Sequence, residues 1–203
     1  MTEAIGDRHK AKMEKRKAVQ DAEVASKTIL EKGLLIVHTG PGKGKSTAAL
    51  GLIVRALGQG FKVGVVQFIK GAWDTGERRL LETLGKGRIE WHAMGEGFTW
   101  ETQDRERDVA AARRAFDKAK DLMADPEIRL LVLDELNIAL RYDYLPLDEV
   151  VEVLKNRRPD LHVVVTGRNA KPELIETADL VTEMTLVKHH FAAGVRAQPG
   201  IEF

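Results

Sequence analysis

Short apolar runs alternate along the chain with segments in which apolar residues recur every three or four positions. The runs predict buried strands, and the periodic segments predict helices that pack on them. The expected strands are Leu34–His38, Lys62–Phe68, Ile89–His92, Arg129–Glu135, Leu161–Thr166 and Leu180–Leu186. The expected helices are Ser46–Gln59, Glu77–Leu84, Asp104–Met123, Leu147–Asn156 and Lys171–Ala178. This alternation predicts an α/β fold with a mostly parallel sheet of about six strands and helices on both faces.

The first 32 residues lack this pattern. Residues 1–17 hold six Lys or Arg against three acids, and the apolar residues around them are small and scattered. A helix of this kind buries little surface, so its stability in isolation is marginal. We expect a basic helical arm over residues 1–32, partly disordered without ligand, and a single domain over 33–203. The arm is either a solvated, frayed segment or a lid that orders over an anionic ligand or a partner subunit.

A glycine-rich loop lies between the first expected strand and the first expected helix, within GLLIVHTGPGKGKSTAAL at 33–50. A strand, such a loop and a helix opening at Lys-Ser are typical of a P-loop, so we expect a P-loop NTPase-like fold. The loop amides attract phosphate oxygens, Lys45 reaches a phosphate, and the Ser46 hydroxyl suits Mg²⁺. The usual G-x-x-x-x-G-K-S/T pattern would begin at Thr39, and the first glycine comes one residue later. The candidate nucleotide-binding residues are Thr39, Gly40, Pro41, Gly42, Lys43, Gly44, Lys45, Ser46 and Thr47.

Two adjacent carboxylates, Asp134 and Glu135, end the fourth expected strand. An acid after four apolar residues is typical of the Walker-B position, which holds Mg²⁺ directly or through water. The metal candidates are therefore Ser46, Asp134 and Glu135. Glu135 has two open roles: it activates water, as in many ATPases, or it completes the metal shell. The structural alternative for both acids is to cap the helix that follows.

Two large aromatic residues, Phe98 and Trp100, stand one residue apart on a glycine-broken loop. They either anchor the loop or form a platform for a flat, apolar ligand near the nucleotide. Arg168, after a strand, and Arg55, on the P-loop helix, are candidates for contacts to phosphate or nucleoside oxygens. The alternative for each arginine is a solvated surface position.

Composition narrows the classes of protein. The net charge of +1 gives no field that would steer the chain to nucleic acid or to a membrane. The absence of cysteine excludes disulfides, thiolate metal sites and a cysteine nucleophile. The chain has no run of 18 apolar residues, and its charged N-terminus lacks an apolar signal segment. We expect a cytoplasmic protein that contacts neither nucleic acid nor membrane.

Seven stretches make the chain resemble the P-loop ATP:corrinoid adenosyltransferases, which act on cob(I)alamin or cob(I)yrinic acid a,c-diamide. They are TGPGKGKSTAA (39–49), VGVVQFIKG (63–71), GFTWET (97–102), LVLDEL (131–136), YDYLPL (142–147), VTGR (165–168) and VKHHFAAGVRAQPGIEF (187–203). The resemblance covers nearly all of 33–203. Pro41 departs from the asparagine that is frequent in the family, and Ser46 replaces the usual threonine but keeps a hydroxyl.

The resemblance implies transfer of the 5′-deoxyadenosyl group of ATP to the cobalt(I) of a reduced corrinoid, with release of triphosphate. It implies Mg²⁺, with Mn²⁺ as the alternative ion, and Lys45 on the triphosphate. Phe98 and Trp100 would pack under the corrin and displace the lower cobalt ligand. It also implies a homodimer, an arm that closes over the partner's site, and a flavin-type reductase as electron donor. The alternatives are a RecA-type ATP-hydrolysing motor or switch and a non-catalytic carrier of corrinoid or nucleotide.

Overall fold

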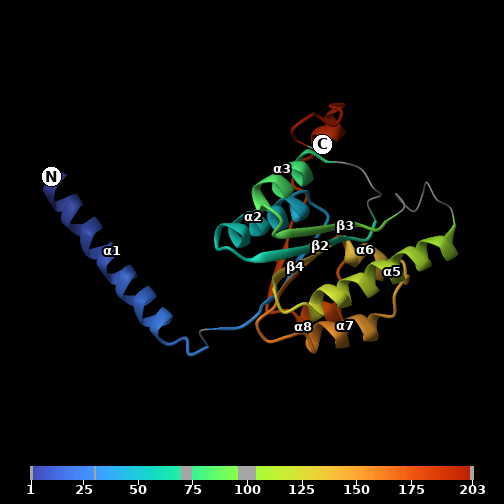
Figure 1. The fold of residues 1–203 in the computed structure, drawn as a ribbon. Coiled ribbons are helices and arrows are strands. Elements are labelled where there is room, and N and C mark those ends of the chain that lie inside the picture. Colours follow the sequence, from blue (N-terminus) through green and yellow to red (C-terminus); the bar gives the residue numbers. More distant parts are fainter. Residues whose placement is uncertain (1, 30, 70–74, 96–103, 202–203) are drawn as a thin grey trace. The chain divides into compact units, whose positions relative to one another are not determined.

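The computed structural model of the chain describes residues 2–29, 31–69, 75–95 and 104–201, and the side chains among these from residue 6 onward. In this part of the chain six strands form one sheet in the order β3-β2-β4-β5-β1-β6, and every neighbouring pair is parallel (Figure 1). The strands are β1 Leu35–Thr39, β2 Lys62–Gln67, β3 Ile89–Ala93, β4 Ile128–Asp134, β5 His162–Thr166 and β6 Leu180–Glu183. The predicted α/β fold with a six-stranded parallel sheet is confirmed.

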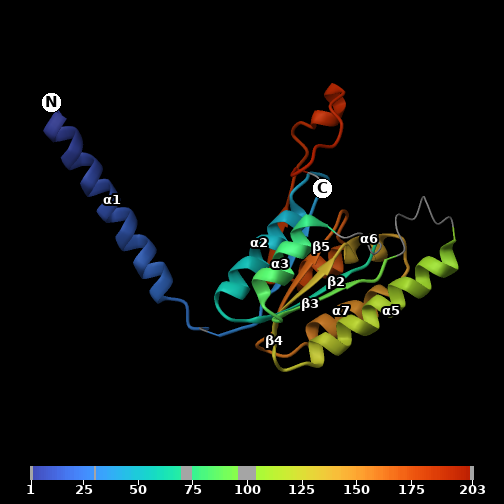
Figure 2. The same ribbon diagram turned by 45° about the horizontal axis from the view of Figure 1, so that its top comes forward.

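Helices cover both faces of the sheet (Figure 2). One face carries α2, Lys45–Gly58, and α3, Gly76–Gly85. The other face carries α5, Arg105–Ala124, α6, Leu136–Arg141, α7, Leu147–Lys155, and α8, Pro172–Thr177. A short 3-10 helix, η1, His190–Ala193, lies in the segment after β6. No bounds for α6 and η1 could be predicted, because both helices are too short to show a helical period in the sequence.

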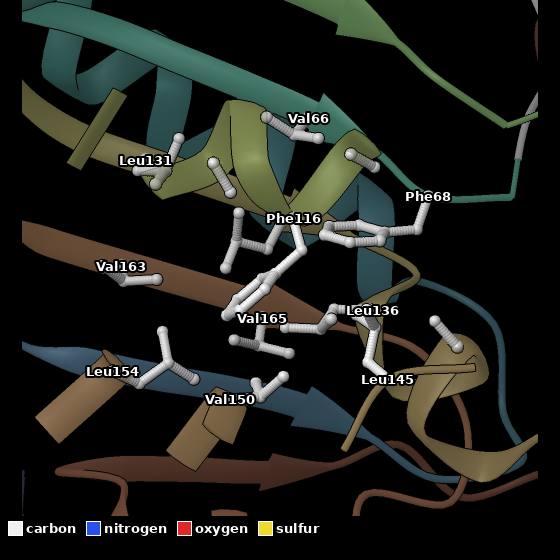
Figure 3. Close-up of a cluster of buried hydrophobic side chains, with 14 of the residues drawn as sticks. Val66, Phe68, Phe116, Leu131, Leu136, Leu145, Val150, Leu154, Val163 and Val165 are labelled. Atoms are coloured by element: carbon white, nitrogen blue, oxygen red, sulfur yellow. The ribbon is translucent and has the colours of Figure 1, made fainter. Parts of the chain in front are cut away.

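The strand residues divide between two apolar cores with the period of two that a sheet requires. Leu131 and Leu133 of β4 belong to the core under α5 to α8, whereas Val132 belongs to the core under α2 and α3. Phe116 of α5 is fully buried in the first core, between strand residues such as Val165 and residues of the helices below (Figure 3). Buried faces on both sides explain why these strands read as continuous apolar runs.

Five of the six predicted strands end one to three residues from the observed end, and two of these differences bear on the site. The fourth strand ends at Asp134, and Glu135 instead has a left-handed backbone, with φ 64, at the start of α6. The last strand ends at Glu183 rather than Leu186, because the chain beyond it leaves the edge of the sheet and crosses the P-loop. All four residues of β6 are exposed, as an edge strand allows.

Residues 1–32 form a unit separate from residues 33–203. Helix α1 spans Thr2–Ala25, and its described side chains are exposed. The role of this arm as a lid stays a prediction. None of the described helices is both long enough and apolar enough to cross a membrane.

Candidate nucleotide and metal site

Polar side chains gather at the carboxyl ends of the strands. The polar residues that are buried in the described part of the chain are His38, Thr39, Gln67, Asp134, Asn137 and Thr166. All of them end a strand or follow β4 at the start of α6. Buried polar groups cost free energy unless they are hydrogen-bonded, so their concentration at one edge marks the functional edge of the sheet. Ligands of open α/β sheets bind at this edge.

The P-loop runs from β1 into α2. Gly40, with φ 95, and Gly44, with φ 108, have left-handed backbones that favour glycine. Gly44 also forms the N-cap of α2, so the free amides of the first helical turn begin at Lys45. Thr39 accepts a hydrogen bond on Oγ1 from the amide of Ala170, over 3.0 Å, which ties the loop to the segment after β5.

Lys45 lies folded against this loop. Its Nζ donates a hydrogen bond of 2.9 Å to the carbonyl of Gly40 and another hydrogen bond to the carbonyl of Gly42. Burial lowers the pKa of Lys45, and the charge of Arg168 lowers it further. The repulsion shows that positive charge is concentrated around the loop, which suits an anionic ligand.

Asp134 is held by side chains from three other elements. Its Oδ1 accepts hydrogen bonds from the hydroxyls of Ser46, over 2.9 Å, and Thr166, over 2.7 Å. Its Oδ2 accepts one from Nε2 of Gln67 over 3.0 Å. The amide of Gln67 is oriented in turn, because its Oε1 accepts a hydrogen bond of 2.9 Å from the indole of Trp91. The chain of contacts from Trp91 to Asp134 fixes the carboxylate beside the first turn of α2.

The donor set at Ser46 and Asp134 fits Mg²⁺. A hydroxyl and a carboxylate are hard oxygen ligands, and Mg²⁺ commonly binds one or two carboxylates together with waters and phosphate oxygens. The residues that the structure describes contain no group of three or more His, Cys, Asp and Glu that would form a closed metal site. Because waters and phosphate oxygens can complete the shell around a hydroxyl and a carboxylate, the pair suits an ion that arrives with a nucleotide.

Glu135, the other metal candidate, lies next to Asp134 but outside the strand. Its backbone amide donates a hydrogen bond of 2.9 Å to Oγ1 of Thr166. The charge of Glu135 acts on Lys45, whose pKa it raises against the larger effect of burial. The role of Glu135 as metal ligand or base stays a prediction.

The other candidates divide by position. Pro41, Lys43 and Thr47 are exposed on the loop and the first turn of α2. Arg168 is exposed just after β5. Arg55 is exposed in the last turn of α2, about 15 Å along the helix axis from Lys45 at 1.5 Å per residue, so the structure does not bring it to the loop.

Phe98 and Trp100 lie outside the described residues. Three residues that support Asp134 were not predicted from the sequence: Gln67, Trp91 and Thr166. Gln67 and Thr166 could have been recognised from the sequence, since each is a polar residue at the carboxyl end of an apolar strand. For Trp91 no local pattern indicated a role, because its hydrogen bond to Gln67 depends on the packing of β3 against β2.

The parallel sheet, the glycine-rich loop and the Ser46–Asp134 pair define a P-loop nucleotide-binding protein. Residues 31–203 match the family described as ATP:corrinoid adenosyltransferase BtuR/CobO/CobP. Residues 6–24 match the family described as cob(I)alamin adenosyltransferase N terminal. The chain belongs to the ATP:corrinoid adenosyltransferase family.

Individual relatives extend over nearly the full length. A corrinoid adenosyltransferase of Pseudomonas aeruginosa is 56% identical over 97% of this chain and 96% of its own. One of Escherichia coli K12 is 48% identical over 97% of this chain and 98% of its own. The solved RadB recombinase is 18% identical over 78% of this chain and 77% of its own, with a TM-score of 0.46, too distant to bear on function.

Proposed function

We propose that the P-loop edge of the sheet binds ATP and directs its 5′-deoxyadenosyl group to the cobalt of a reduced corrinoid, in adenosylcobalamin biosynthesis. The observation that carries this proposal is the joint position of Lys45, Ser46 and Asp134 around the loop of a chain of this family. Lys45 and the amides of the loop bind the triphosphate, and Arg168 adds positive charge beside them.

The reaction needs no nucleophile from the protein. The electron pair of cobalt(I) attacks C5′ of ATP, a cobalt–carbon bond forms, and the C5′–O5′ bond breaks. The electron pair of that bond leaves on the oxygen of triphosphate. The protein therefore acts by orienting C5′ toward cobalt and by stabilising the charge that develops on the leaving group. Donors fixed around a loop perform the second task without reorganising.

Ser46 and Asp134 would hold Mg²⁺, with Glu135 completing the shell, and Mn²⁺ is the alternative ion. When bound, the ion neutralises part of the charge on the triphosphate. Thr166 and Gln67 keep Asp134 oriented toward Ser46. The proposed reaction favours the metal role of Glu135 over its role as a base, since transfer to cobalt requires no activated water.

Phe98 and Trp100 are proposed as the platform beneath the corrin, on the resemblance of GFTWET to the family. Packing of two aromatic side chains against the lower face would exclude the lower cobalt ligand. Cobalt(II) without that ligand is easier to reduce, so the platform would serve the reduction step. An electron-donating reductase, expected to be of the flavin type, is the proposed partner for that step.

We also propose a cytoplasmic homodimer in which the arm of one copy closes over the nucleotide site of the other. Gly33, where the domain begins, is anchored at the amino end of β1: its amide donates to the carbonyl of Pro159 over 2.6 Å, and its carbonyl accepts from Arg157 over 2.8 Å. The P-loop follows the opposite end of the same strand. The arm therefore joins the domain at the edge of the sheet opposite its own P-loop. This connection is consistent with an arm that covers the nucleotide site of a second copy.

The phosphorus product tests the proposal. Purified protein would be incubated with MgATP and chemically reduced cobalamin, and phosphate species would be separated by ³¹P NMR. The account predicts triphosphate in amounts equal to the adenosylcobalamin formed. ADP with orthophosphate would favour the RecA-type motor or switch, and binding of both ligands without turnover would favour the carrier.

A further inference from the structure

The segment after β6 runs directly against the P-loop. β6 pairs with β1 as far as Glu183 opposite Thr39. Two backbone hydrogen bonds then continue past the end of the sheet. The amide of Met184 donates to the carbonyl of Thr39 over 2.9 Å, and the amide of Gly42 donates to the carbonyl of Met184 over 2.7 Å. We call Glu183–Thr185 the strap.

The strap lies so close to the P-loop that it explains why residue 42 is glycine. A Cβ on Gly42 would lie 2.5 Å from the carbonyl oxygen of Thr185 and 2.7 Å from that of Met184. The φ angle of Gly42 lies outside the left-handed region, in contrast to those of Gly40 and Gly44. Backbone conformation therefore does not require glycine at this position, whereas the strap does.

The strap also engages an amide that P-loops commonly direct at phosphate. Loop amides form an anion nest when successive N–H groups converge on the ligand. Here the amide of Gly42 points to Met184 instead. Lys45 donates to the carbonyls of Gly40 and Gly42, and a Cβ on Gly40 would also meet Met184, at 2.5 Å. The strap thus borders both residues that hold the lysine side chain.

We propose that the strap is a positioning element of the nucleotide site. It keeps the Gly42 amide out of the phosphate cradle and fixes the loop, so that the triphosphate is bound by the amides of Gly44, Lys45 and Ser46 and by the Lys45 side chain. A glycine-rich loop has many accessible conformations, and a fixed backbone on its outer side removes that freedom before the ligand arrives. The proposal rests on the nucleotide-binding function proposed above.

The direct test is the through-hydrogen-bond coupling between ¹⁵N of Gly42 and the carbonyl ¹³C of Met184, measured by NMR in the labelled full chain with and without inorganic triphosphate. The proposal predicts the coupling in both states. Loss of the coupling on saturation with triphosphate would overturn it, because the amide would then have turned to the ligand. Failure of the wild-type chain to bind triphosphate would instead contradict the proposed function.

Binding measurements on variants provide a second test of the strap. Gly42→Ala is expected to weaken triphosphate binding by about tenfold or more, as a displaced cradle does, with little change in the thermal midpoint. Gly51→Ala on α2 is the matched control, because a Cβ there meets nothing within 4 Å, and it should bind triphosphate normally. Met184→Pro, which removes the amide bonded to Thr39, should reproduce the loss, whereas Val187→Pro, at a side chain that is 92% exposed, should not. If folded Gly42→Ala bound triphosphate with wild-type affinity, the strap would not position the nucleotide site.

Discussion

The hydroxyl of Ser46 donates a hydrogen bond of 2.9 Å to the carboxylate of Asp134, across 88 residues of sequence. β1 and β4 are not neighbours in the sheet, since β5 lies between them. The contact forms because α2 begins at the carboxyl edge and turns its first residues over β5 toward β4. This pair joins the phosphate-binding loop to the metal-binding strand, and the predictions below start from the site around it.

Lys45→Ala should remove a charge-assisted contact to the leaving triphosphate. Such contacts contribute about 1.5–3 kcal/mol, so both ATP affinity and kcat should fall. The measurement is adenosylation with chemically reduced corrinoid, with Lys155→Ala at an exposed position of α7 as the comparison variant. Wild-type rates in purified Lys45→Ala would show that the lysine does not serve the triphosphate.

Gln67→Leu should weaken the use of Mg²⁺ more than the fold. The change removes a donor to Asp134 and leaves the indole of Trp91 without its acceptor. Loss of a residue that orients a metal ligand typically costs about 10–100-fold in metal affinity or activity. We expect the Mg²⁺ concentration needed for ATP binding to rise, as followed by calorimetry. Gln59→Leu, at an exposed position, is the control. An unchanged Mg²⁺ dependence in Gln67→Leu would mean that Gln67 does not orient Asp134 for the ion.

Stability should fall as pH falls below the ordinary histidine pKa. Nδ1 of His162 accepts a hydrogen bond of 3.1 Å from the amide of Leu34, so the folded chain requires the unprotonated ring. Burial lowers the pKa of His162, and the charges of Arg129 and Arg157 lower it further. The unfolded chain then binds the proton more readily, and stability is lost as pH falls through about 6.5 toward the lower folded pKa.

Chemical denaturation between pH 8 and pH 5 checks this prediction. One such histidine contributes up to about 1.4 kcal/mol per pH unit within the titration range. Burial also lowers the pKa of His38 and of His92. The dependence of the unfolding free energy on pH should therefore be weaker in His162→Gln than in the wild-type chain, but not absent. If the unfolding free energy of His162→Gln depended on pH as strongly as that of the wild-type chain, His162 would not cause the loss of stability at low pH.

The sequence predicted the sheet well because its strands are buried on both faces and therefore read as unbroken apolar runs. Lys45, Ser46 and Asp134 could be proposed as site residues from the sequence, because a local pattern identifies each of them. The sequence could not predict the support of Asp134 by Gln67 and Trp91, since that depends on how β2 and β3 align in register. The P-loop pattern likewise gave no sign that Gly42 faces residues near the C-terminus, because this contact is made between segments more than a hundred residues apart.

Trp100→Ala should separate reduction of the corrinoid from transfer. Loss of aromatic contact area worth roughly 1–3 kcal/mol would leave room for the lower ligand to stay on cobalt. The variant should bind ATP normally, fail to form four-coordinate cobalt(II), and recover activity when cobalt(I) is supplied chemically. The measurement is the visible or magnetic spectrum of the cobalt(II) corrinoid with MgATP. A four-coordinate signal of wild-type size in the double variant Phe98→Ala, Trp100→Ala would return these residues to a loop-anchoring role.

The destination of C5′ of ATP shows whether this chain transfers the 5′-deoxyadenosyl group to cobalt. ATP labelled with ¹³C at C5′ would be incubated with the protein, Mg²⁺ and chemically reduced cobalamin, and the labelled carbon followed by ¹³C NMR. We predict that the wild-type chain yields adenosylcobalamin with the label bound to cobalt and that this signal is strongly reduced in Lys45→Ala. A label that stays in ADP or ATP while the wild-type protein turns over nucleotide would contradict this prediction.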